Sequence, residues 1–402
     1  MPSNRYIAAL DIGTHTIKAL VVSQKNGNDL EVAFQAQRES KGVRRGIVVR
    51  PEDVSYILQD VFCQLKTELK KNIDSLYVNI DGSHLFCQPS HGLISVSRAD
   101  RKISKEDVDR VLQEAKIVSL PPLKEIFDIV PQEFIIDGEK GIKDAQGLQG
   151  LRLEADILAI GGFAPYLKNH TQAILNSDFQ ILDRIPSPIA AAEACLTEKQ
   201  KELGSAIVDM GAGTSGLAVF KEGDLIHLAI LPMGSANITE DIAVGFKIEM
   251  DLAERIKLEY GSCQPVKNKK PEKIKVEGED PLVFSQKQLL GIIVPRVSEI
   301  FTEINRHLKG ISKEKSLPGG VILTGGGAKL PKIAELAKKE LKLPVRIGKP
   351  RGILNLDDPI WSVSCGLILG GLNLEAGGKE QFPGIRGGIG NKIKKIFKIF
   401  IP

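Results

Sequence analysis

Two aspartates, Asp11 and Asp209, each stand at the end of an apolar, β-branched run and directly before a short turn of small residues. The first run reads ALDIGTHTIKALVV and the second reads AIVDMGAGTSGLAVF. Both have the order apolar strand, Asp, Gly, Thr and apolar strand, which predicts a strand, a tight turn and a second strand. An Asp beside such a turn can hold a hydrated Mg²⁺ that shares the charge of a phosphate.

Glycines in the two turns favour phosphate binding. Gly13 in the first copy, and Gly211 and Gly213 in the second, allow backbone N–H groups to point into the turn without a Cβ in the way. For one copy alone an ordinary hairpin is the simpler interpretation, because Asp-x-Gly is common at hairpin turns. The shared order of the two copies favours a pair of turns that hold a polyphosphate from both sides.

The GAGTSG stretch of the second copy also matches the glycine pattern of dinucleotide-binding folds. That fingerprint must open a helix, whereas the β-favouring residues 217–220 follow here. A Rossmann site is therefore excluded.

A third glycine-rich turn follows a late apolar strand, in VILTGGGAKLPKIAELAKKEL, before a helix expected to begin near Pro331. Gly325, Gly326 and Gly327 let the backbone pass close to a flat ligand, so they suit the base and ribose of a nucleotide. Glycine-rich turns between a strand and a helix also occur without any ligand, and both alternatives stay open here.

The composition is that of an ordinary soluble protein. The 402 residues allow two to four domains, and 26% charged with 42% hydrophobic residues is typical of globular chains. A net charge of +4 gives no global sign of nucleic-acid binding. The five cysteines are scattered without CxxC spacing, which indicates reduced thiols rather than disulfides or a zinc site. No signal peptide or apolar run of roughly 18 residues is present, so we expect a protein that stays in the cytosol unless a short segment anchors it.

The elements that must position the turns alternate between strands and helices. We expect a strand in LEVAFQAQRES, an amphipathic helix over residues 54–71, and a strand in SLYVNIDG that ends at Asp81-Gly82. From His84 to about residue 164 the pattern changes to a small inserted α+β module. Its helix carries a capping pattern at Ser104 and Asp107 and runs through Ala115.

Later segments continue the alternation of helix and strand. Helices are expected over residues 167–176, 189–201 and 285–308, with a strand near Ile181 and a helix in MDLAERIKLEYGSC. The most polar stretch, residues 264–280, is rich in lysine. A solvated loop is the simpler interpretation of that stretch, and an acidic partner is the alternative.

The two Asp-Gly-Thr hairpins and the late Thr-Gly-Gly-Gly turn resemble the actin/Hsp70/sugar-kinase ATPase superfamily in order and spacing. Within it, the segments SPIAAAEA, LAERIKLEYG, IIVPRVSEIF and IVPQEFIIDGEKGIKDAQGLQGLRLEADI are similar to the FtsA family of bacterial cell-division proteins. The resemblance covers nearly the whole chain. It implies an α/β, actin-like, two-lobed ATPase fold of duplicated ribonuclease H-like domains with an inserted α+β subdomain.

The resemblance also implies a division of the chain into subdomains. The expected parts are residues 1–83 and 165–197 (first lobe, 1A), 84–164 (insert, 1C), 198–240 and 302–373 (second lobe, 2A), 241–301 (2B), 374–388 (flexible linker) and 389–402 (amphipathic helix).

By the same resemblance, ATP and Mg²⁺ lie between the lobes, and Asp11 and Asp209 face the metal through water. The implied phosphate contacts are Gly13, Thr14, His15 and Lys18 on one side and Gly211, Gly213 and Thr214 on the other. The other implied nucleotide contacts are Gly234, Glu254, Lys257, Gly325, Gly326, Gly327 and Ala328. For Lys18, a solvated side chain on a strand is the alternative.

One position departs from the pattern of actin-like filament ATPases. They often carry a carboxylate just before the Pro-x-Ala-Ala-Ala turn, where it can orient or deprotonate the attacking water, and this chain has Ser187 there. A hydroxyl is a poor base, so we expect slow hydrolysis at most, with ATP mainly setting lobe closure and self-association. Glu193 could substitute if its helix faced the site.

The C-terminal tail has its own pattern. Residues 374–388 contain five glycines and a proline, which predicts a flexible linker. In GNKIKKIFKIFIP, apolar and lysine side chains separate onto two faces of a helix, as in helices that lie in a membrane interface. The expected membrane-binding residues are Ile389, Lys392, Ile393, Lys394, Lys395, Ile396, Phe397, Lys398 and Phe400. A C-terminal helix docked on its own core is the alternative.

The partners follow from the resemblance alone. They are the C-terminal tail of the tubulin-like FtsZ, docking on residues 241–301 with Arg296 as a candidate, further copies of the chain, an anionic membrane and later divisome proteins that bind the insert. The expected place is the cytoplasmic face of the membrane at the division septum. An actin-like adaptor of type IV pilus assembly and a soluble small-molecule kinase remain as alternatives.

Overall fold

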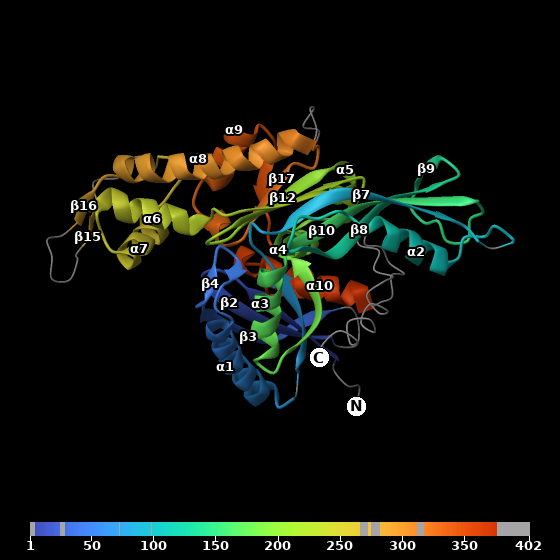
Figure 1. Ribbon diagram of the computed structural model, residues 1–402. Coiled ribbons are helices and arrows are strands. Elements are labelled where there is room, and N and C mark those ends of the chain that lie inside the picture. The colour runs from blue at the N-terminus through green and yellow to red at the C-terminus, as the bar shows by residue number, and fades with distance from the viewer. Residues whose placement is uncertain are drawn as a thin grey trace.

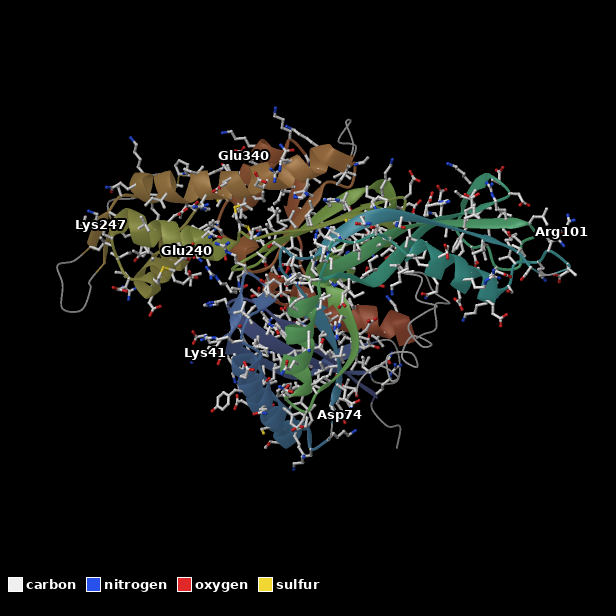
Figure 2. The ribbon with its side chains drawn as sticks, viewed as in Figure 1. Lys41, Asp74, Arg101, Glu240, Lys247 and Glu340 are labelled. Carbon is white, nitrogen blue, oxygen red and sulfur yellow. The ribbon has the colours of Figure 1, made fainter. Side chains whose placement is uncertain are left out.

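A computed structural model describes residues 5–24, 29–71, 73–97, 99–265, 272–274, 282–311 and 317–375. Figure 1 shows a lower lobe, an upper lobe and two extensions that point in opposite directions from the upper lobe. One extension holds α6 (Ser235–Phe246), α7 (Met250–Tyr260) and α8 (Gln286–Ile311). The other holds β7 (Phe86–Ser95), β8 (Lys124–Ile136), β9 (Glu139–Ile142) and α2 (Lys105–Ala115). The far ends of the two extensions are marked in Figure 2 by Lys247 and Arg101.

The first lobe is built on a six-stranded sheet in the order β11-β6-β1-β2-β3-β19. Its strands are β1 (Arg5–Ile12), β2 (Thr16–Gln24), β3 (Leu30–Glu39), β6 (Ser75–Ile80), β11 (Gln180–Pro186) and β19 (Ile353–Leu354). β1, β2 and β3 are antiparallel, and β6 runs parallel to both β1 and β11. The predicted first hairpin is therefore confirmed, with Asp11 opposite Lys18.

The second lobe repeats this arrangement in a five-stranded sheet, in the order β14-β13-β12-β17-β18. Its strands are β12 (Ser205–Met210), β13 (Ser215–Lys221), β14 (Asp224–Leu231), β17 (Val321–Thr324) and β18 (Val345–Ile347). Three antiparallel strands are again followed by two parallel ones, and Asp209 stands opposite Gly216. The duplication expected from the two hairpins is present in the whole sheet.

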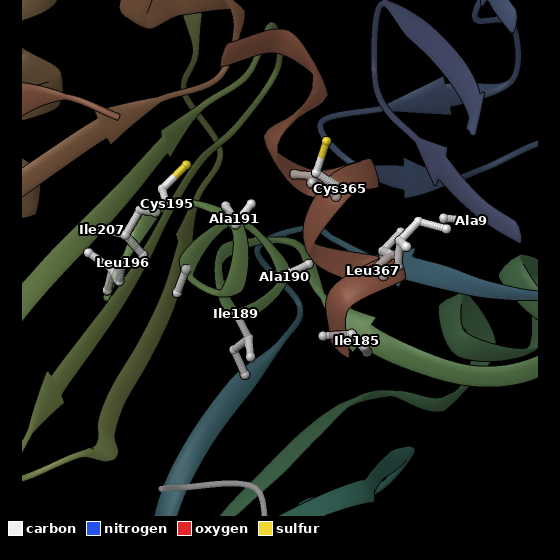
Figure 3. Close-up of a cluster of buried hydrophobic side chains, with 14 of the residues drawn as sticks. Ala9, Ile185, Ile189, Ala190, Ala191, Cys195, Leu196, Ile207, Cys365 and Leu367 are labelled. Atoms are coloured by element: carbon white, nitrogen blue, oxygen red, sulfur yellow. The ribbon is translucent and has the colours of Figure 1, made fainter. Parts of the chain in front are cut away.

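Two helices, α4 (Ser187–Cys195) and α10 (Ser362–Glu375), pack against each other where the lobes meet. Figure 3 shows them side by side within a buried apolar cluster that draws on both sheets. Their backbones come so close that a Cβ on Gly366 would lie 1.6 Å from the carbonyl oxygen of Ala190. Small residues are therefore required on the facing sides of both helices.

The insert is a four-stranded antiparallel sheet in the order β7-β10-β8-β9. Its elements are β7 (Phe86–Ser95), α2 (Lys105–Ala115), β8 (Lys124–Ile136), β9 (Glu139–Ile142) and β10 (Arg152–Phe163). The capping box predicted at Ser104 and Asp107 is present at the start of α2. Gly92 admits this helix, because a Cβ there would lie 2.4 Å from the backbone nitrogen of Ala115.

The remaining elements cover the lobes and form the second extension. They are β4 (Val43–Arg44), β5 (Ile47–Val48), α1 (Pro51–Leu69), α3 (Ala164–Leu175), α5 (Glu198–Leu203), α6 (Ser235–Phe246), α7 (Met250–Tyr260), β15 (Glu272–Ile274), β16 (Leu282–Phe284), α8 (Gln286–Ile311) and α9 (Ile333–Leu341), with 3₁₀ turns at Gly326–Lys329 and Pro359–Trp361.

Two predicted helices differ from the structure for a clear local reason, and the bounds of the other expected helices differ by at most three residues. The helix expected over residues 189–201 is two helices, because Thr197 starts α5 with a capping box and interrupts α4. The helix expected near Pro331 begins at Ile333, because Lys332 adopts a left-handed backbone with φ of 65°.

The C-terminal predictions fall largely outside the described residues. α10 continues to Glu375, two residues into the expected linker, and residues 376–402, with the predicted amphipathic helix, are not described. No helix among the described residues is long and apolar enough to cross a membrane.

Candidate nucleotide cleft

A cavity of about 490 Å³ lies between the lobes, and both hairpins, α7 and the turn after β17 contribute to its wall. The sequence-predicted residues that line it are Asp11, Gly13, Thr14, His15, Lys18, Asp209, Gly211, Thr214, Glu254, Lys257, Gly325, Gly326 and Gly327. The structure thus brings together residues that are more than three hundred positions apart. Their role as nucleotide ligands stays a prediction.

Asp11 in the first hairpin already has a cationic partner. The Lys18 Nζ donates to Asp11 Oδ2 at 2.8 Å, and Asn79 Nδ2 donates to Asp11 Oδ1 at 2.9 Å. Lys18 stands opposite Asp11 in the antiparallel ladder, and its side chain is 12% exposed. The alternative of a solvated Lys18 is therefore wrong.

Asp209 in the second hairpin has no hydrogen-bond or ion-pair partner in the part of the chain that the structure describes. Burial raises the pKa of Asp209 to about 7, and the charges of Asp81 and Asp11 add to the rise while Lys18 opposes it. Gly325 is needed beside it, because its φ is +82° and a Cβ there would lie 2.4 Å from Asp209 Oδ1. A carboxylate in this state favours an incoming cation.

Asp81 is a third aspartate in the cavity, and the sequence reasoning missed it. Its Oδ2 accepts a hydrogen bond from Thr214 Oγ1 at 2.8 Å, and its Oδ1 accepts one from the Gly82 N–H at 2.8 Å. Burial raises the pKa of Asp81 to about 6, and the charge of Asp11 contributes. The available signal was Asp-Gly at the end of a strand, because parallel β1 and β6 end at the same edge of the sheet.

Three predicted residues do not line the cavity: Gly213, Gly234 and Ala328. Gly213 lets the two hairpins meet, since a Cβ there would lie 2.7 Å from the Thr14 side chain. Gly234 packs on the second turn, where a Cβ would lie 2.4 Å from the carbonyl oxygen of Ala212. Ala328 is buried within the 3₁₀ turn. These three residues therefore pack behind the walls of the cleft in this structure and do not line it.

One end of the cavity combines a charged network with an apolar wall. Lys257 Nζ lies 2.7 Å from Glu254 Oε2 and donates to Thr239 Oγ1 at 2.8 Å, which fixes both side chains on α7. Apolar side chains that the sequence reasoning did not assign complete this end, namely Ile238, Leu258, Leu330, Pro331 and Ile360. Leu258 follows Glu254 by one helical turn, a spacing that could have identified it.

Ser187 lines the cavity at the start of α4, where its Oγ accepts a hydrogen bond from Asn79 Nδ2 at 3.0 Å. Glu193 instead pairs with Lys201, at 2.9 Å between Oε1 and Nζ, and does not line the cavity. The possibility that Glu193 replaces the missing base is therefore not supported by its position.

The donor set fits Mg²⁺. This ion prefers oxygen ligands and is usually held by one or two carboxylates together with water and substrate phosphates. Asp11 and Asp209 supply carboxylates from opposite lobes to one cavity.

Arg296 lies on α8 and does not line the cavity. Its Nε and Nη2 donate to the two carboxylate oxygens of Asp241 at 2.6 and 3.0 Å, and Nη1 donates to Glu299. The guanidinium is thus held in place by α6 and by its own helix.

Solved structures with a similar fold are actin-like proteins. One is from the PilM-PilN type IV pilus biogenesis complex, with a TM-score of 0.66, 16% identity and coverage of 91% of this chain and 98% of the other. Another is MreB5 of Spiroplasma citri bound to ADP, with a TM-score of 0.56, 14% identity and coverage of 92% and 97%. At this identity the likeness shows the fold alone, and it confirms the predicted actin-like architecture.

Sequence comparison is more specific. The model of cell division protein FtsA matches residues 206–366, and the model of the SHS2 domain inserted in FtsA matches residues 82–160. Cell division protein FtsA of Pseudomonas aeruginosa is 31% identical over 94% of this chain and 92% of that protein. The Bacillus subtilis protein of the same name is 31% identical over 92% and 84%. The chain belongs to the FtsA family of cell-division proteins.

Proposed function

We propose that this chain binds ATP with Mg²⁺ between its lobes and, as a filament, tethers FtsZ to the inner face of the cytoplasmic membrane at the septum. The observation that carries the proposal is the meeting of two Asp-Gly-Thr hairpins with the same order of residues at one cavity. Such a pair can hold a polyphosphate from both lobes and so couple nucleotide binding to the lobe arrangement.

Each part of the cavity has a proposed role. Asp11 and Asp209 hold Mg²⁺ through water, and the ion, when bound, offsets the charge of the phosphates. The backbone of both turns binds phosphate oxygens, and the apolar wall beside Leu258 and Leu330 receives the base. The solved MreB5 structures, which have a similar fold and are bound to ADP and to AMPPNP, support the proposal that this chain binds a nucleotide.

Hydrolysis is proposed to be slow. Ser187 occupies the position where a carboxylate would activate water, and its hydroxyl is already bound by Asn79. Asp81 does line the cavity, but Thr214 and Gly82 hydrogen-bond to its two oxygens. A brisk Mg²⁺-dependent turnover that is lost in Asp209→Ala would contradict this part of the proposal.

The contacts with partners are proposed from the family. The FtsZ tail would dock on residues 241–301, where the bidentate pair with Asp241 orients Arg296, and the insert would serve self-association and later divisome proteins. The tail of residues 389–402 would lie in the membrane interface, with lysines that each contribute on the order of 1 kcal/mol on an anionic surface. A filament that displays many tails would bind far more tightly than one subunit.

Co-sedimentation with anionic liposomes and FtsZ tests this function. The full chain should bring FtsZ into the liposome pellet with ATP and Mg²⁺, whereas a chain without residues 389–402 should bind FtsZ but leave both proteins in the supernatant. Liposome binding that persists after the truncation, or a full chain that pellets without FtsZ, would contradict the proposal.

A further inference from the structure

We infer that Asp81 sets the preference of the cleft between ATP and ADP, because its carboxylate occupies the Thr214 hydroxyl that a terminal phosphate would use. The inference rests on the proposed nucleotide site and deepens it. It assigns to Asp81 a part in ligand discrimination that is separate from the metal-facing role of Asp11 and Asp209.

The hydrogen bond between Thr214 Oγ1 and Asp81 Oδ2, at 2.8 Å, crosses from the second lobe to the first. The other carboxylate oxygen accepts from the Gly82 N–H at 2.8 Å, which fixes the orientation of the group. Gly46 closes the remaining side, since its φ is +74° and a Cβ there would lie 2.9 Å from Asp81 Cγ. The carboxylate is therefore held against the tip of the second hairpin.

The same junction connects the tips of both hairpins. The Gly46 N–H donates to Thr14 Oγ1 at 2.8 Å, and Gly213 packs on the Thr14 side chain. The apolar wall for a base comes from other elements, namely α6, α7, the turn after β17 and the 3₁₀ turn Pro359–Trp361. A nucleotide with its base on that wall and its phosphates along the hairpins places its last phosphate beside Asp81.

Charge makes this position selective. Asp81, Asp11 and Asp209 act on one another through their charges, and the cation of Lys18 is engaged by Asp11. A third phosphate must compete with Asp81 for Thr214 and lies close to its negative charge, whereas a diphosphate ends short of it. The carboxylate therefore penalises ATP more than ADP.

Asp81→Asn tests the inference, because the amide keeps the size and a carbonyl acceptor for Thr214 but removes the charge. Dissociation constants for ATP and ADP with Mg²⁺ would be measured by calorimetry at pH 8, where Asp81 is ionised because its raised pKa of about 6 lies below that pH. We expect ATP to bind about tenfold more tightly and ADP to change by less than about twofold. Asp60→Asn is the control, because Asp60 is 59% exposed and pairs with Arg38 outside the cavity.

The substitution Thr214→Val provides a second test of the inference. It removes the hydroxyl for which Asp81 and the phosphate compete, so Asp81→Asn should improve ATP binding less in this background than in the wild type. An unchanged ratio of ATP to ADP affinity in Asp81→Asn, or a selective loss of ATP binding, would overturn the inference while the nucleotide site stands. If the wild type binds neither nucleotide, the proposed function fails as well.

Discussion

The two hairpins of the cleft share a motif but differ in the residue opposite the aspartate. Lys18 stands opposite Asp11 in the first ladder and neutralises it, whereas Gly216 stands opposite Asp209 in the second. Gly216 is required there because a Cβ would lie 2.4 Å from Cγ of Pro188, at the start of α4. The helix at the lobe junction therefore takes the space that a cation fills in the other lobe.

Because of this difference, the two copies of the motif have different roles in ligand binding. The first hairpin is balanced without a ligand, while the second keeps a carboxylate whose pKa is raised to about 7 and which lacks a partner among the described residues. A metal ion that enters the cleft is therefore stabilised more by Asp209 than by Asp11, which already pairs with Lys18. The asymmetry suggests why a duplicated fold can respond to a nucleotide by moving one lobe toward the other.

Asp11→Ala should have the largest effect on stability. It leaves the Lys18 ammonium, which is 12% exposed, without its partner, and breaking a buried pair in this way costs about 3 to 5 kcal/mol. Urea unfolding of the nucleotide-free protein measures the loss. Adding Lys18→Met should recover part of it, and an Asp11→Ala protein as stable as the wild type would show that the pair is not a stabilising unit.

Asp209→Asn should stabilise the protein, whereas Asp11→Ala should destabilise it. The amide removes a charge that burial disfavours, so the unfolding free energy at pH 8 should rise by about 1 to 3 kcal/mol. The same urea titration provides the measurement. A fall in stability comparable to that of Asp11→Ala would mean that the two hairpins are equivalent after all.

Gly216→Ala tests why the second hairpin lacks a cation. The new Cβ would meet Pro188 at 2.4 Å, and such overpacking costs about 1 to 3 kcal/mol. In a Pro188→Ala background the cost should be much smaller, because the ring carbon in conflict is gone. An equal loss of stability from Gly216→Ala in both backgrounds would show that the contact with Pro188 is not its cause.

Asp128→Asn tests how the unfolding free energy depends on pH, and it should have the smallest effect of these substitutions. Burial and the charge of Asp183 raise the pKa of Asp128 to about 7, and Asp128 does not line the cleft. A carboxylate whose folded pKa is raised stabilises the protein below its unfolded pKa and loses that contribution as pH rises through the folded value.

The unfolding free energy of the wild type should therefore fall between pH 6 and 8, and Asp128→Asn should reduce the fall by about 1 kcal/mol. The part of the fall that remains in Asp128→Asn would come from the cleft carboxylates. Adding Asp209→Asn should therefore reduce the fall in unfolding free energy further. A pH profile that neither substitution changes would contradict both assignments.

Local patterns predicted much of this molecule. Strand, Asp, Gly and Thr in order identified both hairpins, and Ser104 with Asp107 identified the start of α2. Such features depend on neighbours in the sequence, which a single chain displays. The turn at Gly325 was found for the same reason, because only a glycine accepts its φ of +82° beside Asp209 without strain.

Contacts between distant segments were harder to predict. Asp81 enters the cleft only because β6 lies beside β1, and its partner Thr214 is 133 residues away. Gly213 was expected to contact phosphate, but its close approach to Thr14 depends on how the lobes meet. Strand order and lobe contact are set by packing of the whole chain, which motif spacing does not encode.

The central claim is that both hairpins hold one nucleotide, and the ATP affinity of Asp209→Asn tests it most directly. This variant is expected to be more stable than the wild type, so weaker binding cannot be attributed to unfolding. Calorimetry with Mg²⁺ should show ATP affinity reduced by about 10- to 100-fold, as for the loss of a group that holds a metal through water, with Asp60→Asn unchanged. An Asp209→Asn protein that binds ATP as tightly as the wild type would contradict the account.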